Sequence, residues 1–392
     1  MEKALRKYLD HYAEKEKVFA EHINDNFSDC VIIPAFDEGP AILNALESLL
    51  NCQSDKPLCI VVNNAPRGAP DKALQNTAET STAVQARFNE IDSLDENNST
   101  KLLRFGKGAL LLIDRYSSDS ALDPKAGVGG ARKIGTDLAL SLWAQGKLDS
   151  KWLHQSDADV AFPSDYFSRA RQASSRPQAA ALLYPFAHES NAALRYEISL
   201  RYYVLGLAYA GSPYAFHTIG STLAVNPAAY AQVRGFPKRQ AAEDFYLLNK
   251  LAKVASIEKL AGEPLVLSSR ISHRVPFGTG VAVEKIQNEG EDAPKLYHPA
   301  LFAELREKVQ SLANERAVHE RFDAFRTLKW MHQGRDTRHS SLPFWHALEQ
   351  APFIELGAEL KQSGLVALRR YLYDLETMLQ KRNGIDRDHG TH

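Results

Sequence analysis

Short apolar runs that end in polar turns recur along the first third of the chain. The runs Val31 to Ile33, Leu58 to Val62 and Ala109 to Asp114 are almost wholly aliphatic, which is typical of strands buried on both faces of a parallel sheet. Helical spacing of apolar residues follows the first run at 41–50 and the third at 127–145. This alternation predicts an α/β protein with a Rossmann-like, mostly parallel central sheet and flanking helices.

The same pattern divides the chain into three parts. Residues 1–27 are predicted to hold an N-terminal amphipathic helix that packs on the main domain. Residues 28–281 form that α/β domain, interrupted at about 67–107 by a polar insertion that is expected to be helical in part. Residues 282–392 are rich in helix formers and predict a helical C-terminal region, in which core packing is the expected role of the large aromatic side chains, Trp330, Phe344 and Trp345.

Two carboxylates follow the apolar stretch Trp152-Leu153, which is typical of the end of a strand. Alternate side chains at a strand's carboxyl end point the same way, so Asp157 and Asp159 are expected to aim at one point in the ligand-binding crevice of an open α/β sheet. Carboxylate oxygens there suit Mg²⁺ or Mn²⁺, which bind through one or two carboxylates and the phosphates of a substrate. A solvated turn capped by the two aspartates is the alternative.

Two other segments carry candidate chemistry. Glycines at 127–130 precede Arg132 at the start of a predicted helix, where backbone amides and the arginine can approach a phosphate. The alternative is a flexible loop with a surface arginine, because no complete P-loop or dinucleotide fingerprint is present. Glu243 and Asp244 open another predicted helix, where capping of the helix dipole is the alternative to a catalytic role.

Composition narrows the class of protein. The 392 residues are 44% hydrophobic and 24% charged, as in soluble globular proteins, and the net charge of −1 gives no electrostatic argument for a nucleic-acid partner. Three cysteines without metal-type spacing favour a reducing compartment over a disulfide framework. The chain shows neither the apolar core of a signal peptide nor a membrane-spanning run, so a cytoplasmic protein without a transmembrane segment is expected.

Several short motifs stand in a fixed order between about residues 28 and 275. They are Val31-Ile32-Ile33-Pro34-Ala35-Phe36-Asp37-Glu38 in a first strand, Asn63-Asn64 after a second, Ala131-Arg132-Lys133-Ile134-Gly135, the D-x-D of Asp157 and Asp159, Gly220-Ser221-Thr222-Leu223-Ala224, Arg234-Gly235-Phe236, and Glu243-Asp244. This order resembles that of family 2 glycosyltransferases with a GT-A fold. The resemblance implies a glycosyltransferase of the hexosyltransferase class that takes its sugar from a nucleoside diphosphate donor.

The resemblance also implies roles for individual residues. The donor's base, ribose and diphosphate would be held by Pro34, Ala35, Asp37, Glu38, Asn63, Asn64, Arg132, Asp157, Arg270 and Arg274. Mn²⁺ or Mg²⁺ would be bound by Asp159, with Asp157 on the ribose or a metal-bound water, and by His273 as a further ligand. Asp244 would deprotonate the acceptor in an inverting reaction, with Glu243 orienting it or capping the helix.

Departures from the family pattern limit what is implied. Asn63 and Asn64 stand where aspartate is usual, which leaves the nucleobase open, although a UDP-sugar is favoured. No Q-x-x-R-W element follows Asp244, and together with the absence of transmembrane runs this favours transfer of one sugar to a soluble or diffusible acceptor. The helical C-terminal region then either shapes the acceptor pocket or forms a homodimer contact.

Three other functions stay open. A retaining glycosyltransferase would share the fold and the D-x-D but would not need Asp244 as a base. A sugar nucleotidyltransferase would use a nucleoside triphosphate, and the missing glycine-rich Lys/Arg signature near the first strand counts against it. A non-catalytic nucleotide-sugar-binding module would need the aspartate pair but not Asp244.

Overall fold

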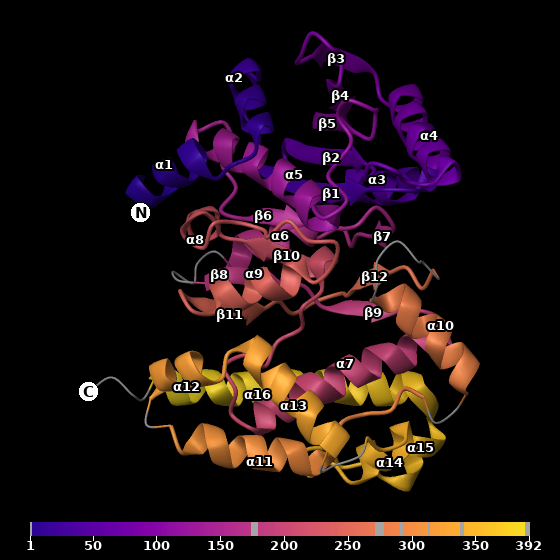
Figure 1. The fold of residues 1–392 in the computed structure, drawn as a ribbon, viewed down its shortest axis with the longest axis vertical. Coiled ribbons are helices and arrows are strands. Elements are labelled where there is room, and N and C mark those ends of the chain that lie inside the picture. Colours follow the sequence, from indigo (N-terminus) through magenta and orange to yellow (C-terminus); the bar gives the residue numbers. More distant parts are fainter. Residues whose placement is uncertain are drawn as a thin grey trace. The chain divides into compact units, whose positions relative to one another are not determined.

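The computed structural model describes residues 2–173, 179–270, 278–290, 293–312, 314–337 and 341–388. The chain forms two compact units. The first is Met1–Phe186 with Thr218–Ser268, and the second is Ala187–His217 with Ser269–His392. Each unit is therefore assembled from segments that lie apart in the sequence (Figure 1).

The described part of the first unit contains a nine-stranded sheet in the order β11-β8-β10-β6-β1-β2-β5-β4-β3. Its strands are β1 (Asp29–Ala35), β2 (Pro57–Asn64), β3 (Glu90–Ser93), β4 (Thr100–Phe105), β5 (Gly108–Arg115), β6 (Leu153–Gln155), β8 (Ala179–Leu183), β10 (Leu223–Val225) and β11 (Ser256–Lys259). Strands β6, β1, β2 and β5 are parallel neighbours, whereas β10 runs antiparallel between β6 and β8. The predicted α/β class with a mostly parallel central sheet is confirmed.

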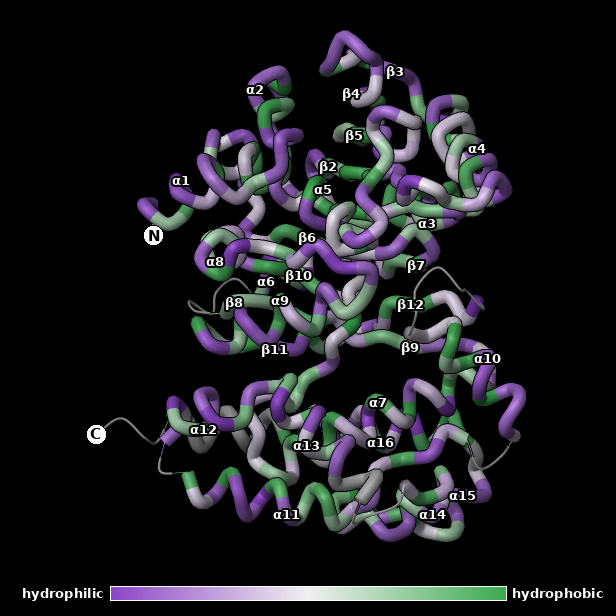
Figure 2. The backbone as a smooth tube through the Cα atoms, viewed as in Figure 1, coloured by the Kyte–Doolittle hydropathy of each residue, from purple (hydrophilic) through white to green (hydrophobic). Residues whose placement is uncertain are grey.

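Helices cover both faces of the parallel strands. On one face, Val31, Ile33 and Val61 join the core that includes Ile42 and Leu46 of α3 (Ile42–Leu50), which follows the 3₁₀ turn η2 (Gly39–Ala41). On the other face, α5 (Gly127–Ala144) crosses β1 and β2. All residues of β1 and β2 are buried, which explains why their apolar runs are continuous rather than alternating. Figure 2 shows the hydrophobic colour of β2.

The insertion at about 67–107 is helical in part, as expected, but it also extends the sheet. Helix α4 (Asp71–Arg87) is followed by β3 and β4, and β4 pairs antiparallel with β5. The pattern of apolar residues gave little sign of these strands, because Leu102, Leu103 and Phe105 are buried while β3 is almost entirely exposed. Pairing with β4 covers what would otherwise be an open edge of β5.

The expected single N-terminal helix is wrong, because the segment breaks into α1 (Glu2–His11), the 3₁₀ turn η1 (Lys15–Val18) and α2 (Phe19–His22). The break is stabilised by the buried carboxylate of Asp137. It accepts hydrogen bonds from the hydroxyl of Tyr8 at 2.6 Å and from the backbone N–H of Glu14 at 2.8 Å. Glu14 has an extended backbone, since its amide donates to a side chain of α5 rather than to a preceding turn of helix.

Shorter elements complete the first unit. They are β7 (Val160–Ala161), α6 (Tyr166–Ala173), η3 (Gly220–Thr222), α8 (Pro227–Gln232), α9 (Glu243–Leu251) and β12 (Leu265–Leu267), with β9 (Phe186–His188) at its boundary. The motif Gly220 to Ala224 is divided between η3 and β10, and only β10 joins the sheet.

The second unit is helical. Its helices are α7 (Asn191–Tyr209), α10 (Thr279–Glu289), α11 (Pro299–Gln310), α12 (Glu315–Arg321), α13 (Ala324–Thr337), α14 (Phe344–Glu349), α15 (Ala358–Gln362) and α16 (Gly364–Asp388). Phe344 is fully buried in its core, and Trp330 and Trp345 pack against that core. The core role of these aromatics is as predicted, but the helical unit also includes α7, which the sequence placed in the α/β domain.

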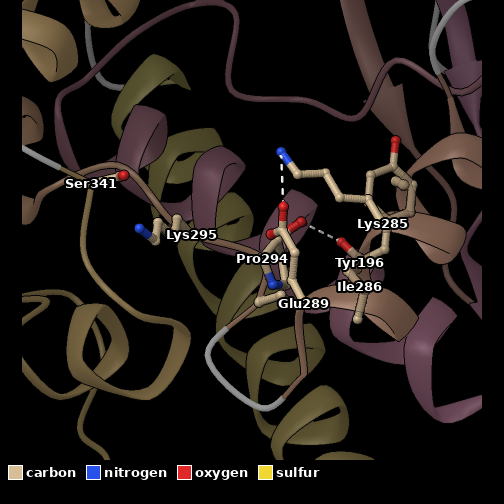
Figure 3. A pocket seen from close by; sticks show the side chains of 10 residues that line it. Tyr196, Lys285, Ile286, Glu289, Pro294, Lys295 and Ser341 are labelled. Atoms are coloured by element: carbon tan, nitrogen blue, oxygen red, sulfur yellow. Dashed lines mark hydrogen bonds and ion pairs between the residues drawn. The ribbon is translucent and has the colours of Figure 1, made fainter.

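Buried charges and a pocket accompany that core. Arg201 of α7 donates to Glu197 at 2.9 Å and to Glu376 of α16 at 3.3 Å. Between α7 and α10 lies a pocket of about 610 Å³ whose walls include Tyr196, Lys285 and Glu289 (Figure 3).

Within the part of the chain that the structure describes, no helix combines the length and apolar character needed to cross a bilayer.

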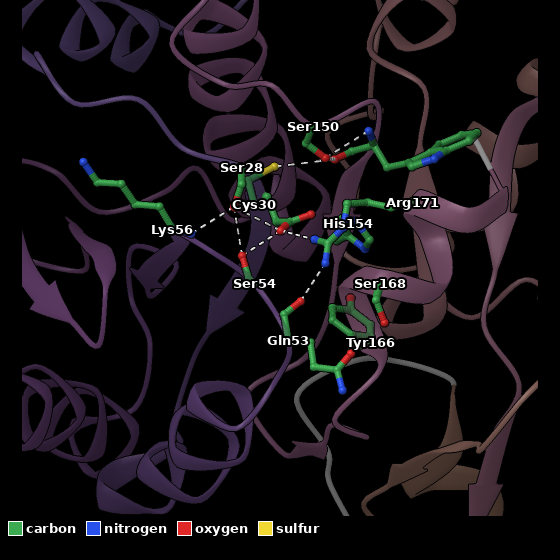
Figure 4. A network of polar contacts seen from close by, with 12 residues as sticks. Ser28, Cys30, Gln53, Ser54, Lys56, Ser150, His154, Tyr166, Ser168 and Arg171 are labelled. Carbon is green, nitrogen blue, oxygen red and sulfur yellow. Dashed lines mark hydrogen bonds and ion pairs between the residues drawn. The ribbon is translucent and has the colours of Figure 1, made fainter. Parts of the chain in front are cut away.

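His154 of β6 is a core histidine of the first unit. Its ring lies 5.1 Å from that of Tyr166, 5.2 Å from that of Phe167 and 5.9 Å from that of Tyr184, measured between centroids. Figure 4 shows it beside Tyr166 and Arg171. Burial lowers the pKa of His154 to about 4, with Arg171 adding to the shift and Asp29 opposing it.

We expect this histidine to make folding stability fall with acid. The pKa of an unfolded histidine is about 6.5, so between pH 6.5 and 4 the unfolded state binds more protons than the folded state. The free energy of unfolding therefore falls as the pH falls through this window, by up to about 3 kcal/mol. Urea unfolding at several pH values should show this slope, and His154→Phe should flatten it. The exposed His11→Asn serves as the control, and an unchanged slope in His154→Phe would contradict the assignment.

Candidate active site

The order of the strands locates a crevice at the carboxyl ends of β1 and β6. From β1 the chain passes outward to β2 and then β5, and it returns to the other side of β1 as β6. Open α/β sheets bind ligands where the strand order reverses in this way. Asp37 follows β1 at this point and Asp157 follows β6, so the topology brings two of the predicted site segments to one edge of the sheet.

The D-x-D segment leaves the sheet directly after β6. Ser156, Ala158 and Val160 are buried, whereas Asp157 and Asp159 between them are half-buried. The side chain of Asp157 is 42% exposed. The two carboxylates are therefore the groups of this segment that a ligand can reach, and they are hard oxygen donors of the kind that Mg²⁺ and Mn²⁺ prefer.

Arg132 of α5 connects this segment to the start of α9. Its Nη2 donates to Oδ1 of Asp157 at 2.5 Å, and its Nε donates to Oε1 of Glu243 at 3.0 Å. Its Nη1 donates to the carbonyl oxygen of Ser156 at 2.9 Å. The D-x-D and E-D motifs, predicted separately, thus meet through one arginine.

Asp244 lies in the first turn of α9, next to Glu243. Its Oδ1 accepts a hydrogen bond from the backbone N–H of Phe245 at 2.6 Å. Burial raises the pKa of Asp244 to about 7, and repulsion from Glu243 adds to the shift. A carboxylate with a pKa near neutrality can exchange a proton with a substrate hydroxyl, which is a property of general bases.

The carboxylate of Glu243 at the start of α9 pairs with Arg132. The residue before the helix, Ala242, makes no side-chain capping hydrogen bond. The preceding residue, Ala242, has a left-handed backbone with φ of 60°. An alanine in this conformation costs about 1 kcal/mol relative to glycine, so the fold holds the start of α9 in a strained geometry.

The nucleotide-binding residues predicted after β1 and β2 lie beside α4. Asp37, with φ of 56°, accepts a hydrogen bond from Nδ2 of Asn76 at 2.7 Å, and its N–H donates to Thr77 at 3.1 Å. Asn63 donates to the carbonyl oxygen of Thr77 at 2.8 Å, while its own side-chain oxygen is buried and accepts nothing from the described residues.

Four further residues predicted to bind the donor lie in or next to β1 and β2. Pro34 and Ala35 are buried within β1, and Asn64 uses its side-chain amide on the carbonyl oxygens of Ala35 and Val62, at 2.9 Å and 3.0 Å. Glu38 is half-buried at the start of η2. The side chain of Asn64 in β2 therefore contacts β1, whereas the side-chain oxygen of Asn63 can still accept a hydrogen bond.

The sequence suggested that the glycines at 127–130 let the backbone approach a phosphate. In the structure, Gly127 and Gly129 contact another segment of the chain instead. The N–H of Gly129 donates to the carbonyl oxygen of Arg239 at 3.0 Å. A Cβ atom on Gly127 would lie 2.3 Å from Cα of Gln240, and one on Gly129 would lie 2.3 Å from the carbonyl oxygen of Pro237. These glycines instead allow the 237–240 segment to pack on the start of α5.

Two predicted ligands lie outside the described residues, namely His273 and Arg274. Arg270 is described and exposed, and it belongs to the second unit. Over the described ranges, no group of three or more His, Cys, Asp or Glu side chains is arranged to hold a metal ion. The metal ligands therefore stay sequence predictions, of which Asp157 and Asp159 have a described environment.

Sequence reasoning missed three contributors to the site. Thr77 and Asn76 lie in the polar insertion, where the pattern gives no sign that α4 reaches the end of β1. Gly220 was noted only as part of a motif, yet its missing side chain leaves room for the guanidinium of Arg132. Such contacts depend on packing between distant segments and leave no local signal.

No protein-family model and no curated protein matches the chain. Among solved structures it is similar to S. aureus TarS 1–349 in complex with UDP-GlcNAc, at 12% identity over 79% of this chain and 73% of that one, with a TM-score of 0.43. It is also similar to the mannosyltransferase PcManGT from Pyrobaculum calidifontis in complex with GDP-Man and Mn²⁺, at 15% identity over 96% of each chain, with a TM-score of 0.38. When compared with another structure of S. aureus TarS 1–349, this chain covers 60% of that chain, at 14% identity and a TM-score of 0.37.

Proposed function

We propose that the chain is a metal-dependent GT-A glycosyltransferase that moves one sugar from a nucleoside diphosphate sugar to the hydroxyl of a soluble or diffusible acceptor. The observation that carries the proposal is the meeting of the D-x-D and E-D motifs through Arg132 at the carboxyl edge of the sheet. Such an edge is where α/β sheets bind nucleotides. The proposed metal-binding carboxylates and the proposed base would then belong to the same unit.

The donor's nucleoside is proposed to bind at the ends of β1 and β2. The buried side-chain oxygen of Asn63 is an acceptor in need of a donor, and leaving it unsatisfied costs about 1–3 kcal/mol. The N3–H of uracil would supply such a donor, which supports a UDP-sugar. Asp37 and Glu38, both half-buried, would bind the ribose or base from the end of β1.

A divalent ion, Mn²⁺ or Mg²⁺, fits the carboxylates of Asp159 and Asp157. Both are half-buried hard ligands at the switch point, and neither belongs to the hydrophobic core. When bound, the ion would act as a Lewis acid that offsets the charge of the leaving diphosphate. His273 is the proposed further ligand, and Arg270 and Arg274 are proposed to bind the diphosphate.

Asp244 is the proposed general base. Its carboxylate would take the proton of the acceptor hydroxyl while that oxygen bonds to the anomeric carbon, and the bond from this carbon to the diphosphate oxygen breaks on the opposite side. The products are the glycosylated acceptor, with inverted anomeric configuration, and a nucleoside diphosphate. Glu243, paired with Arg132, would hold the start of α9 rather than accept the proton.

The test is a combined binding and turnover screen. We expect UDP-GlcNAc or another UDP-sugar to raise the melting temperature with Mn²⁺ present and to be consumed when acceptors are added, with GDP-mannose as the comparison donor. A ligand present at about 1,000 times its dissociation constant stabilises a fold by about 4 kcal/mol, which is a readily measured shift in melting temperature. Binding without turnover over a broad acceptor panel would favour a non-catalytic module, and a response to nucleoside triphosphates alone would favour a nucleotidyltransferase.

A further inference from the structure

We propose that Arg132 is a positioning residue that locks the carboxylate of Asp157 to the start of α9, and so sets the distance between the donor site and the base Asp244. The inference rests on the proposed function and changes the role that the sequence implied for Arg132, which was direct contact with the diphosphate.

The contacts of the guanidinium carry the argument. Each of its three nitrogens already donates to a protein oxygen, on Glu243, Ser156 and Asp157. The side chain is 2% exposed, whereas Asp157 is 42% exposed. A ligand can therefore reach the carboxylate more readily than the guanidinium that holds it.

The three partners belong to two separate elements. Ser156 and Asp157 follow β6, and Glu243 begins α9. The planar guanidinium fixes the direction of several hydrogen bonds at once, so it sets an orientation as well as a separation. A lysine at this position would supply the charge as a single point and could not reproduce the three contacts.

The fold also makes room for this arrangement. A Cβ atom on Gly220 of η3 would lie 2.8 Å from Nη2 of Arg132 and 3.1 Å from its Cζ. Gly220 has no positive φ, so the requirement for glycine here is space for the guanidinium rather than backbone freedom. Residues from α5, η3, α9 and the D-x-D segment thus form one cluster around Arg132.

Two variants probe the cluster without removing a residue that we assign to the chemistry. Arg132→Lys keeps the charge but loses the multiple hydrogen bonds, and Gly220→Ala keeps Arg132 but displaces its guanidinium. Arg104→Lys, on an exposed residue of β4, is the matched control. Melting temperature and circular dichroism establish that each variant is folded.

The first readout does not depend on the proposed reaction. Amide hydrogen exchange should become at least about tenfold faster at Phe245 and Tyr246, whose amides are hydrogen-bonded at the start of α9, in Arg132→Lys and Gly220→Ala. Protection should be kept in β1 and β2, since local opening follows the loss of local contacts. Unchanged protection of the start of α9 in both variants would overturn the proposal. This result stands even if no nucleotide sugar is turned over.

The second readout separates positioning from direct contact with the donor. We expect kcat to fall by about 100-fold in both variants, as misplacement of catalytic groups by about 1 Å does, while the metal-free Kd for UDP changes by less than about twofold. A metal-free Kd for UDP that weakens by about tenfold or more, with that for uridine unchanged, would instead show that Arg132 binds the diphosphate. A kcat equal to that of Arg104→Lys would also overturn the positioning role.

Discussion

Asp244→Asn is expected to lower kcat by roughly 10²–10⁴-fold, the usual contribution of a general base. The substitution keeps the size of the side chain and its ability to accept a hydrogen bond from the N–H of Phe245, but it cannot take a proton. Donor binding should therefore be retained. Steady-state kinetics with a saturating nucleotide sugar, together with calorimetric titration of the donor, would measure both quantities.

The pH dependence gives the same prediction a second readout. Asp244 acts as a base only when ionised, and burial raises its pKa to about 7. The rate should therefore fall about tenfold per pH unit below about pH 7 and level off above it. This acidic limb of the pH–rate profile should be absent in Asp244→Asn. Asp119→Asn, on an exposed carboxylate, is the matched control. Full activity in Asp244→Asn would remove the base assignment and favour a retaining mechanism.

Asp159→Asn is expected to raise the Mn²⁺ concentration needed for half-maximal activity by at least about tenfold, and to lower kcat by about 10²-fold or more. An amide is a weaker ligand than a carboxylate for a hard divalent ion and lacks its charge. Metal titrations of activity, and of the melting temperature in the presence of UDP, would measure the change.

Asp157→Asn is the informative comparison for this site. Because Asp157 is held by Arg132 and is proposed to touch the ribose or a metal-bound water, its change should affect the Mn²⁺ requirement less than Asp159→Asn does. If both variants show the same Mn²⁺ requirement as the wild type, the D-x-D segment does not bind the ion. In that event the solvated turn, the alternative reading of the segment, would be correct.

The central strands and α5 could be predicted because their signal is local. Strands β1 and β2 are buried on both faces, and this fits their apolar runs Cys30 to Ala35 and Pro57 to Val62. The prediction of a single N-terminal helix was wrong for the opposite reason. The residues of 1–27 favour a helix by themselves, but the hydrogen bond from the Glu14 N–H to Asp137, 123 positions away, ends it.

The candidate site likewise has parts that local sequence indicated and parts that only tertiary packing decided. Motif order indicated Asp157, Glu243 and Asp244, because short segments next to strand ends and helix starts carry recognisable residues. It could not indicate that Arg132 contacts Glu243, since 111 positions separate them. It also could not indicate that Gly127 and Gly129 are packed against the backbone of 237–240.

By itself, then, the sequence determined the α/β class, the parallel strands and the polar residues that end them, because burial and strand geometry constrain each residue through its near neighbours. Only the tertiary structure decided which of those residues meet. It placed α4 at the end of β1, put an antiparallel strand between β6 and β8, and surrounded one guanidinium with oxygens from two motifs. The physical reason is that packing and hydrogen bonding between distant segments depend on the shape of the whole folded unit, which no local pattern records.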